Sequence, residues 1–155
     1  MKTKPKPEII SAPVISLAEN HSEGVVFCQR LRKGLLNGVE IRRLKAYSDW
    51  FVENHLRQLF ALEEMHLYPI LDGNDKSMKR ALAGHRRLLR LATNSSNPLK
   101  SLSLLEEELM LHFRFETLVL WPKMNSVSVA LSINATNAIL YGIDAWTDYD
   151  DKFWN

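Results

Sequence analysis

The sequence HFRFETLVLWP at residues 112–122 decides the fold that we expect, because the chain contains a near copy of it. The earlier copy, LFALEEMHLYP at residues 59–69, matches it at a phenylalanine, a glutamate, a leucine and the aromatic-proline pair. Residues four apart on an α-helix lie on the same face, so His112 and Glu116 point the same way. The near repeat predicts two equivalent helices that end alike and place Glu63 opposite Glu116.

The two copies differ at their first position, where Leu59 corresponds to His112. A histidine and a carboxylate one turn apart, among apolar neighbours, either form a hydrogen-bonded pair or hold a metal ion between them. A leucine side chain cannot bind a metal. The earlier copy is therefore expected to supply the carboxylate of such a site without the imidazole.

The composition fits one compact domain in a reducing compartment. The chain has 155 residues, of which 46% are hydrophobic, and this is enough to bury a full core. A net charge of +2 gives no indication that nucleic acid or an anionic membrane is a partner. One cysteine, Cys28, excludes an intramolecular disulfide, and the basic, proline-rich start is not followed by an apolar run long enough for a signal peptide or membrane span. We therefore expect a cytoplasmic protein.

Apolar periodicity predicts four helices, at about residues 16–35, 39–71, 75–92 and 98–121. The second is long enough for a break near Ser48. Short loops between these helices favour an all-α fold, an up-down-up-down four-helix bundle over residues 14–125.

The two ends of the chain are expected to lie outside this bundle. Residues 1–13 are rich in proline and lysine and predict a mobile leader. Residues 126–155 predict a C-terminal extension, with a short helix at about 130–141. The aromatic and acidic end of this extension is expected to pack back onto the bundle or to meet a partner.

Three imidazoles and two carboxylates are expected to converge in the bundle interior, with at least one from each helix: His21, Glu63, His85, His112 and Glu116. Burying such groups is costly unless they are paired or bind a metal. Imidazole together with carboxylate suits iron, manganese or zinc better than calcium. Two facing carboxylates can also bridge two metal ions.

In this order and spacing, the chain resembles the hemerythrin-like, or HHE cation-binding, domain family, whose members are four-helix bundles with a non-haem di-iron centre. The resemblance covers about residues 15–124 and is carried by His21, residues 59–69, His85 and residues 112–122. It implies two irons bridged by Glu63 and Glu116. It makes His21 a terminal ligand of one iron, and His85 and His112 terminal ligands of the other.

The chain departs from the family pattern at Leu59, where the family has a histidine. The iron beside His21 then lacks one protein ligand, so we expect two irons or, if that half binds weakly, one. His55 and His66 are alternative ligands on nearly the same helix face. Each is displaced along the axis by at least one turn, about 5.4 Å, which is more than a side chain easily spans.

The resemblance implies a non-haem iron protein that binds or senses a diatomic gas, oxygen or nitric oxide, or handles iron itself. Two alternatives stay open. One is a single iron or zinc ion held by His85, His112, Glu63 and Glu116. The other is a metal-free bundle that serves as an interaction scaffold through its basic third helix or its aromatic-acidic tail. No catalytic residue is singled out, so a binding protein is favoured over an enzyme, although an open coordination position would also suit redox chemistry such as peroxide reduction.

Overall fold

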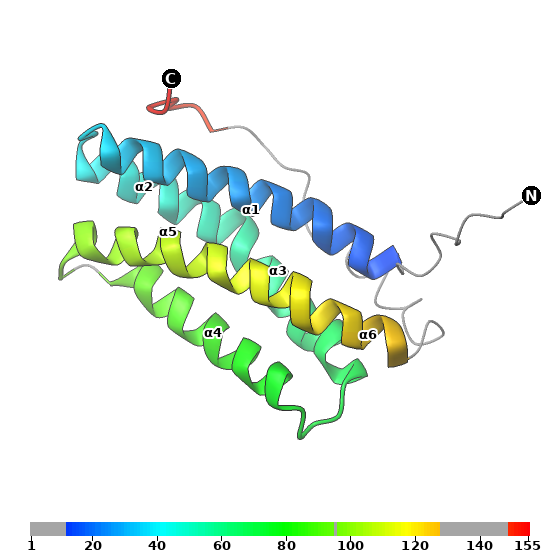
Figure 1. Cartoon of the computed structure of the whole chain (residues 1–155). Coiled ribbons are helices and arrows are strands. Elements are labelled where there is room, and N and C mark those ends of the chain that lie inside the picture. The colour runs from blue at the N-terminus through cyan, green and yellow to red at the C-terminus, as the bar shows by residue number, and fades with distance from the viewer. Residues whose placement is uncertain (1–11, 95, 128–148) are drawn as a thin grey trace, which may run out of the picture.

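The structure is a computed structural model that describes residues 12–94, 96–127 and 149–155. Over these residues every regular element is helical, which confirms the predicted all-α class. Four helical stretches lie side by side and form a bundle (Figure 1). Helix α5 contacts α1 and α4, and α2 packs against all three.

Two of the four stretches are single helices, α1 (Ala12–Leu36) and α4 (Lys76–Thr93). The second stretch is a chain of shorter segments, namely α2 (Ile41–Phe51), η2 (Val52–Leu56), α3 (Arg57–Leu62), η3 (Glu63–Leu67) and η4 (Tyr68–Ile70). The fourth consists of α5 (Pro98–Phe115), η5 (Glu116–Leu120) and α6 (Trp121–Val127).

Local sequence explains where α4 and α5 begin. The Asp75 carboxylate accepts a hydrogen bond from the Met78 N–H at 2.9 Å, and this caps the free donors of the first turn of α4. Asn97 caps α5 in the same way, and Pro98 occupies the first turn, where it loses no hydrogen bond. Both starts agree with the sequence prediction. The predicted break near Ser48 is wrong, because Ser48 is buried within the continuous helix α2.

Glu63 and Glu116 each begin a five-residue π-helical segment, η3 and η5, in which the turns are one residue wider than in an α-helix. Each segment is followed directly by an aromatic-proline pair. Proline has no N–H to donate, so it removes a hydrogen bond where the wider turn already changes the register. The near repeat therefore becomes two helices with the same irregularity. The fourth stretch continues through Pro122 to Val127 and does not end near Pro122 as predicted.

Aromatic side chains fill the core between α1 and α2. The rings of Phe27 and Phe51 stack with centroids 4.0 Å apart, and Tyr47 stacks on Phe27 at 5.2 Å. These three side chains and Cys28 are almost fully buried. Burial of one such apolar side chain contributes about 1.5–3 kcal/mol, so this cluster fixes how α1 sits on α2.

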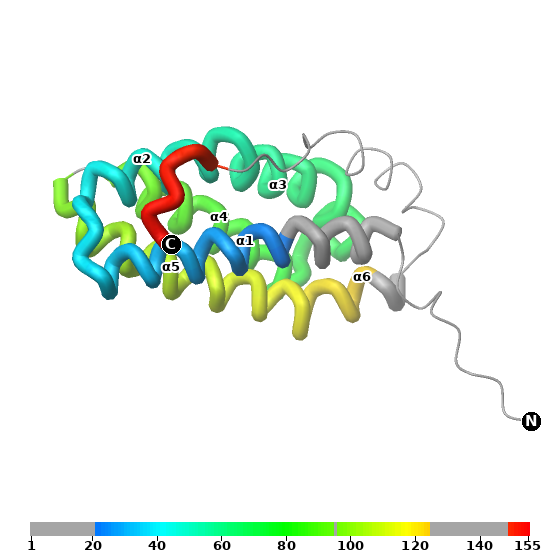
Figure 2. Tube along the Cα trace, turned by 90° about the horizontal axis from the view of Figure 1, so that it is seen from above, coloured from blue at the N-terminus to red at the C-terminus, as the bar shows by residue number. Residues whose placement is uncertain are grey.

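The last described segment, residues 149–155, lies against α1 and α2 (Figure 2). The Arg43 guanidinium donates two hydrogen bonds to the Asp151 carboxylate, at 2.9 and 2.7 Å. Phe153 is buried edge-on against Tyr47 and sits where Gly34 leaves room, because a Cβ there would approach the Phe153 ring to 2.8 Å. The predicted short helix at 130–141 and residues 1–11 of the predicted leader lie outside the described residues, while α1 already begins at Ala12.

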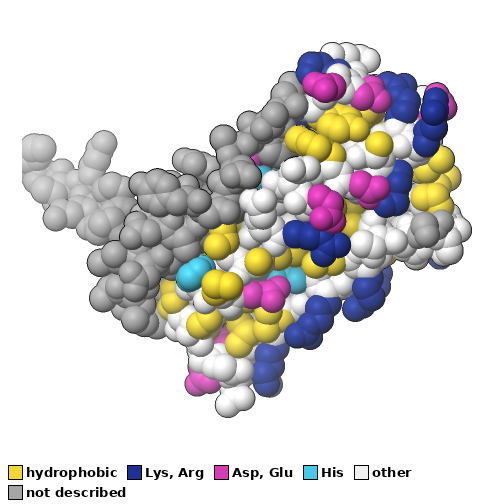
Figure 3. Space-filling model, turned by 180° about the vertical axis from the view of Figure 1, so that it is seen from behind, with side chains coloured by type: hydrophobic (Ala, Val, Ile, Leu, Met, Phe, Trp, Pro, Cys, Tyr) yellow, Lys and Arg dark blue, Asp and Glu magenta, His cyan; other side chains and the backbone are white. Residues whose placement is uncertain are grey.

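The described surface is charged and mixed. From behind, Lys and Arg side chains follow one edge, with apolar side chains scattered among charged ones (Figure 3). Basic residues of α4 are exposed, among them Lys76, Lys79, Arg86, Arg87 and Arg90. Of the helices that the structure describes, none combines the length and the apolar character that crossing a membrane requires.

Candidate metal centre

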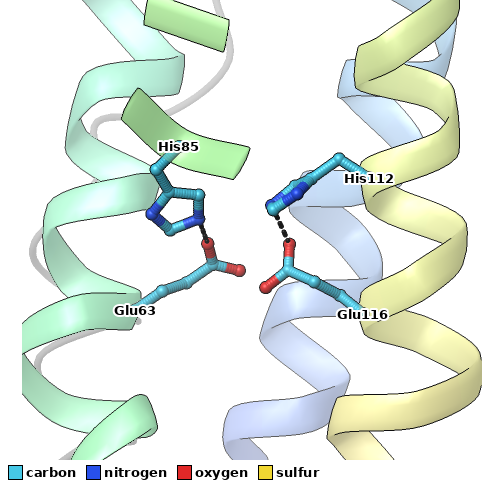
Figure 4. A group of neighbouring side chains, drawn as sticks. All are labelled: Glu63, His85, His112 and Glu116. Atoms are coloured by element: carbon cyan, nitrogen blue, oxygen red, sulfur yellow. Dashed lines mark ion pairs between the residues drawn. The ribbon is translucent and has the colours of Figure 1, made fainter. Parts of the chain in front are cut away.

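Four buried side chains from three helical stretches meet inside the bundle (Figure 4). They are Glu63 at the start of η3, His85 on α4, His112 on α5 and Glu116 at the start of η5. One donor atom from each lies within 4.8 Å of the others. The two carboxylates point toward each other, and each lies beside a histidine. Such a buried group could hold a metal ion.

The distances within this group are short and similar. His85 Nε2 lies 3.1 Å from Glu63 Oε1, and His112 Nε2 lies 3.1 Å from Glu116 Oε1. His21 joins the group from α1, with its Nε2 3.4 Å from Glu116 Oε1 and 3.7 Å from Glu63 Oε2. The five candidate residues from the sequence are thus all in one place. Four form a compact group, and His21 reaches it through the two carboxylates.

Most polar atoms of this cluster have no well-aligned hydrogen bond to the described part of the chain. They are both oxygens of Glu63, Oε1 of Glu116, Nε2 of His112 and both nitrogens of His21. Each buried polar group left in this state costs about 1–3 kcal/mol, and more if it is charged. A cation placed among these lone pairs would remove the cost. The donor set of imidazole and carboxylate therefore fits a transition-metal ion.

His85 is held in a fixed orientation by two contacts. Its ring stacks on Phe60 with centroids 3.8 Å apart, and its Nδ1 lies 2.6 Å from Glu64 Oε2. When Nδ1 carries the proton and donates it to Glu64, Nε2 directs a lone pair into the site. A carboxylate behind a metal-facing histidine is a common arrangement in metal centres. The His85 contact also holds the pKa of Glu64 below its usual value.

Sequence reasoning did not single out Glu64 for this role. It also missed Tyr68, whose hydroxyl donates to Glu116 Oε2 at 2.7 Å and lies 3.0 Å from His85 Nε2. The aromatic-proline pairs were the available signal. Tyr68 from one pair contacts His85, and Trp121 from the other packs on His21 with ring centroids 4.5 Å apart.

The position that breaks the family pattern is fully buried. Leu59 has no exposed surface, and neither alternative histidine joins the group of candidate ligands found among the described residues. His55 is buried near Phe51, with its Nδ1 3.7 Å from Glu23. His66 is half-buried. Neither histidine therefore supplies the further ligand beside His21 that the hemerythrin-like pattern predicts.

Burial and mutual contact shift the acid–base equilibria of the cluster. Burial, together with the charge of Glu116, raises the pKa of Glu63 well above its ordinary value. Burial alone would raise the pKa of Glu116, but the close contacts of His112 and His21 with this carboxylate outweigh it and hold that pKa well below the ordinary value. Burial lowers the pKa of His21, but Glu116 and Glu63 outweigh it and raise the pKa overall. Protons thus stabilise this cluster in the metal-free protein, and a metal ion must displace them.

The fold and the cluster define a class: a helical bundle with a buried His/Glu group that could bind metal. Comparison of the chain with protein-family models, curated protein sequences and solved structures found no match. The resemblance to hemerythrin-like domains therefore stays an expectation from the sequence.

Proposed function

We propose that this protein is a non-haem iron protein of the hemerythrin-like kind, an up-down-up-down bundle that binds oxygen or nitric oxide at an internal metal centre. The observation that carries the proposal is the buried group of imidazole and carboxylate donor atoms within 4.8 Å of one another, most of which have no hydrogen-bond partner among the described residues. Evidence for a scaffold without metal would be a His21 turned away from the glutamates. His21 instead lies 3.4 Å from Glu116 and 3.7 Å from Glu63.

The first ion would be held by His85, His112, Glu63 and Glu116. Two nitrogens and two carboxylate oxygens suit iron, and carboxylate oxygens can also serve a neighbouring ion. Iron bound there would supply a redox-active centre with positions free for a small ligand. The chain's part is to fix the ligand geometry, to exclude bulk water through burial and to hold His85 through Glu64.

A second ion would bind beside His21, more weakly than the first. Among the side chains that the structure describes, only His21 and the two shared carboxylates are available there, because Leu59 supplies no donor. A largely apolar pocket of about 560 Å³ reaches this side of the centre between α1 and α5, and its lining includes His21, Phe113 and Trp121. An apolar approach suits an uncharged diatomic gas better than a charged substrate.

A single-ion centre of iron or zinc is the second candidate. It is favoured by the compactness of the four-residue group, whose donor atoms lie within 4.8 Å of one another without His21. Manganese has compatible ligands as well. The two-ion and single-ion proposals differ in the number and the kind of metal ions that the protein would bind.

The test is anaerobic loading with ferrous iron, followed by nitric oxide and by oxygen, with zinc loading in parallel. We expect the wild type to bind iron and to give the spectrum of an iron–nitrosyl complex. H85A should lose most of the iron, whereas H66A should behave as the wild type, because His66 lies outside the group of candidate ligands. Equal iron binding by both variants, or no nitrosyl signal from iron-loaded protein, would contradict the proposal.

A further inference from the structure

The phenol of Tyr68 lies inside the candidate centre, although the ligand set above does not include it. Tyr68 belongs to the short segment η4 that follows η3, and it is 2% exposed. Its Oη lies 2.7 Å from Glu116 Oε2 and 3.0 Å from His85 Nε2. It therefore touches one candidate ligand from each side of the site.

These distances match the spacing of ligand atoms around one ion. Two ligands at right angles, each bonded at about 2.1 Å, lie about 3.0 Å apart. The two histidine–glutamate contacts of the centre are both 3.1 Å. The two Tyr68 contacts are of similar length, so Oη lies as close to its neighbours as the candidate ligand atoms lie to one another.

The hydrogen-bond donors and acceptors around His85 also favour a metal ion beside the Tyr68 oxygen. When His85 donates its Nδ1 proton to Glu64, its Nε2 carries only a lone pair. That lone pair faces the Tyr68 oxygen at 3.0 Å and Glu63 Oε1 at 3.1 Å. The phenol has one proton, and Glu116 Oε2 accepts it. The Tyr68 oxygen and Glu63 Oε1 thus both lie within 3.1 Å of the His85 Nε2 lone pair, where one metal ion could bind all three.

The near repeat differs between its two copies at the position of this tyrosine. The later copy has His112 and Trp121, and the earlier copy has Leu59 and Tyr68 at the corresponding positions. A tryptophan cannot bind a metal, whereas a tyrosine oxygen can. The copy that lacks the imidazole is therefore the copy that carries a phenol.

We propose that Tyr68 is a further ligand of the metal centre and binds iron through its phenol oxygen beside His85. This inference rests on the proposed function. As the bond from Oη to the ion forms, the O–H bond breaks, and the proton passes through its acceptor Glu116 Oε2 to water. No electron is transferred, because the positive charge of the ion compensates the charge left on the oxygen.

The experiment is absorption and resonance Raman spectroscopy of ferric-loaded protein, with Y68F and the matched control Y47F. Tyr47 is also buried but packs among Phe27 and the C-terminal segment. We expect wild type and Y47F to show a visible phenolate-to-iron charge-transfer band with tyrosine ring vibrations. Y68F should keep iron, lose the band, and release iron to a chelator about 10–100-fold faster.

Iron-loaded wild type without the band, or Y68F with an unchanged band, would overturn the inference and leave the proposed function intact. A wild type that binds no iron would overturn both. Wild type labelled with ring-deuterated tyrosine gives a readout that does not depend on the folding of Y68F. The Raman lines of the band should shift on labelling, and unshifted lines would overturn the assignment to tyrosine.

Discussion

Single side chains define the candidate metal centre and the number of ions that we propose for it. Glu63 and Glu116 face each other at its centre, yet only one side of the pair has two histidines within reach, His85 and His112. On the other side His21 is the one described histidine in contact with the glutamates, and the near repeat has Leu59 where the later copy has His112. The two sides should therefore differ in affinity.

A histidine at position 59 should strengthen the binding of the second ion that we propose beside His21. We expect L59H to raise the iron bound after reconstitution by about one ion per chain, since it adds the ligand beside His21, and L59Q, of similar size, to leave the ratio unchanged. Metal analysis of both variants checks this. A gain that persists in an L59H variant that also carries H21A would show that the added ion lies elsewhere.

The metal-free protein should lose stability as the pH rises. The pKa of His21 is raised in the folded state, so its contribution is fully present below the unfolded value of 6.5 and is lost as pH rises through the higher folded value. The raised pKa of Glu63 acts with the same sign. Urea unfolding of chelator-treated protein between pH 6 and 9, done on wild type and H21L, should show a steeper loss for the wild type. Parallel curves would contradict this.

At the level of helices, the centre depends on how closely α4 approaches α5. A Cβ at Gly84 would lie 2.8 Å from His112 Nδ1, so only glycine lets the two helices meet at this point. Both glutamates also lie where an α-helix widens into a π segment, an irregularity often found at functional sites.

G84A should therefore destabilise the protein, whereas most glycine-to-alanine substitutions within a helix stabilise it. Replacing glycine by alanine inside a helix usually stabilises it by about 0.5–1 kcal/mol. Here the added methyl group should displace His112, so we expect lower stability and faster loss of iron. A83G, at the exposed neighbouring position, measures the propensity effect alone. A stabilised G84A that keeps its iron would show that the contact between α4 and His112 is not tight.

Helical periodicity predicted much of this architecture, because apolar spacing and the signals at Asp75 and Pro98 are local. It did not predict η3, η5 or the continuation through Pro122, since a π segment changes the register without changing the composition. The five candidate residues could be found from spacing and family likeness. Glu64 and Tyr68 could not, because their contacts with His85 depend on how α4 docks against η3 and η4.

For the chain as a whole, the end at residues 149–155 links α1 to α2. Asp151 forms its ion pair with Arg43 across a long stretch of sequence, and Arg30 lies 4.0 Å above the ring of Trp154. Phe153 enters the aromatic core beside Tyr47. This segment therefore acts as a clasp on the end of the bundle that lies away from the candidate metal centre.

The clasp should open in acid. Arg43 holds the pKa of Asp151 below its ordinary value of 3.8, so this contribution is present above 3.8 and is lost as pH falls through the lower folded value. D151N should open the clasp at neutral pH, with faster hydrogen exchange in residues 149–155. D150N is the matched control, because Asp150 is exposed. Equal exchange in the two variants would contradict the role given to the ion pair.

The most direct measurement is the metal content per chain of protein purified without chelators, and again after anaerobic iron loading, for wild type and for the H85A/H112A double variant. We predict at least one tightly bound ion in the wild type and its loss in the double variant. A wild type that holds no metal in either preparation, or a double variant that holds as much as the wild type, would contradict a metal centre at Glu63, His85, His112 and Glu116.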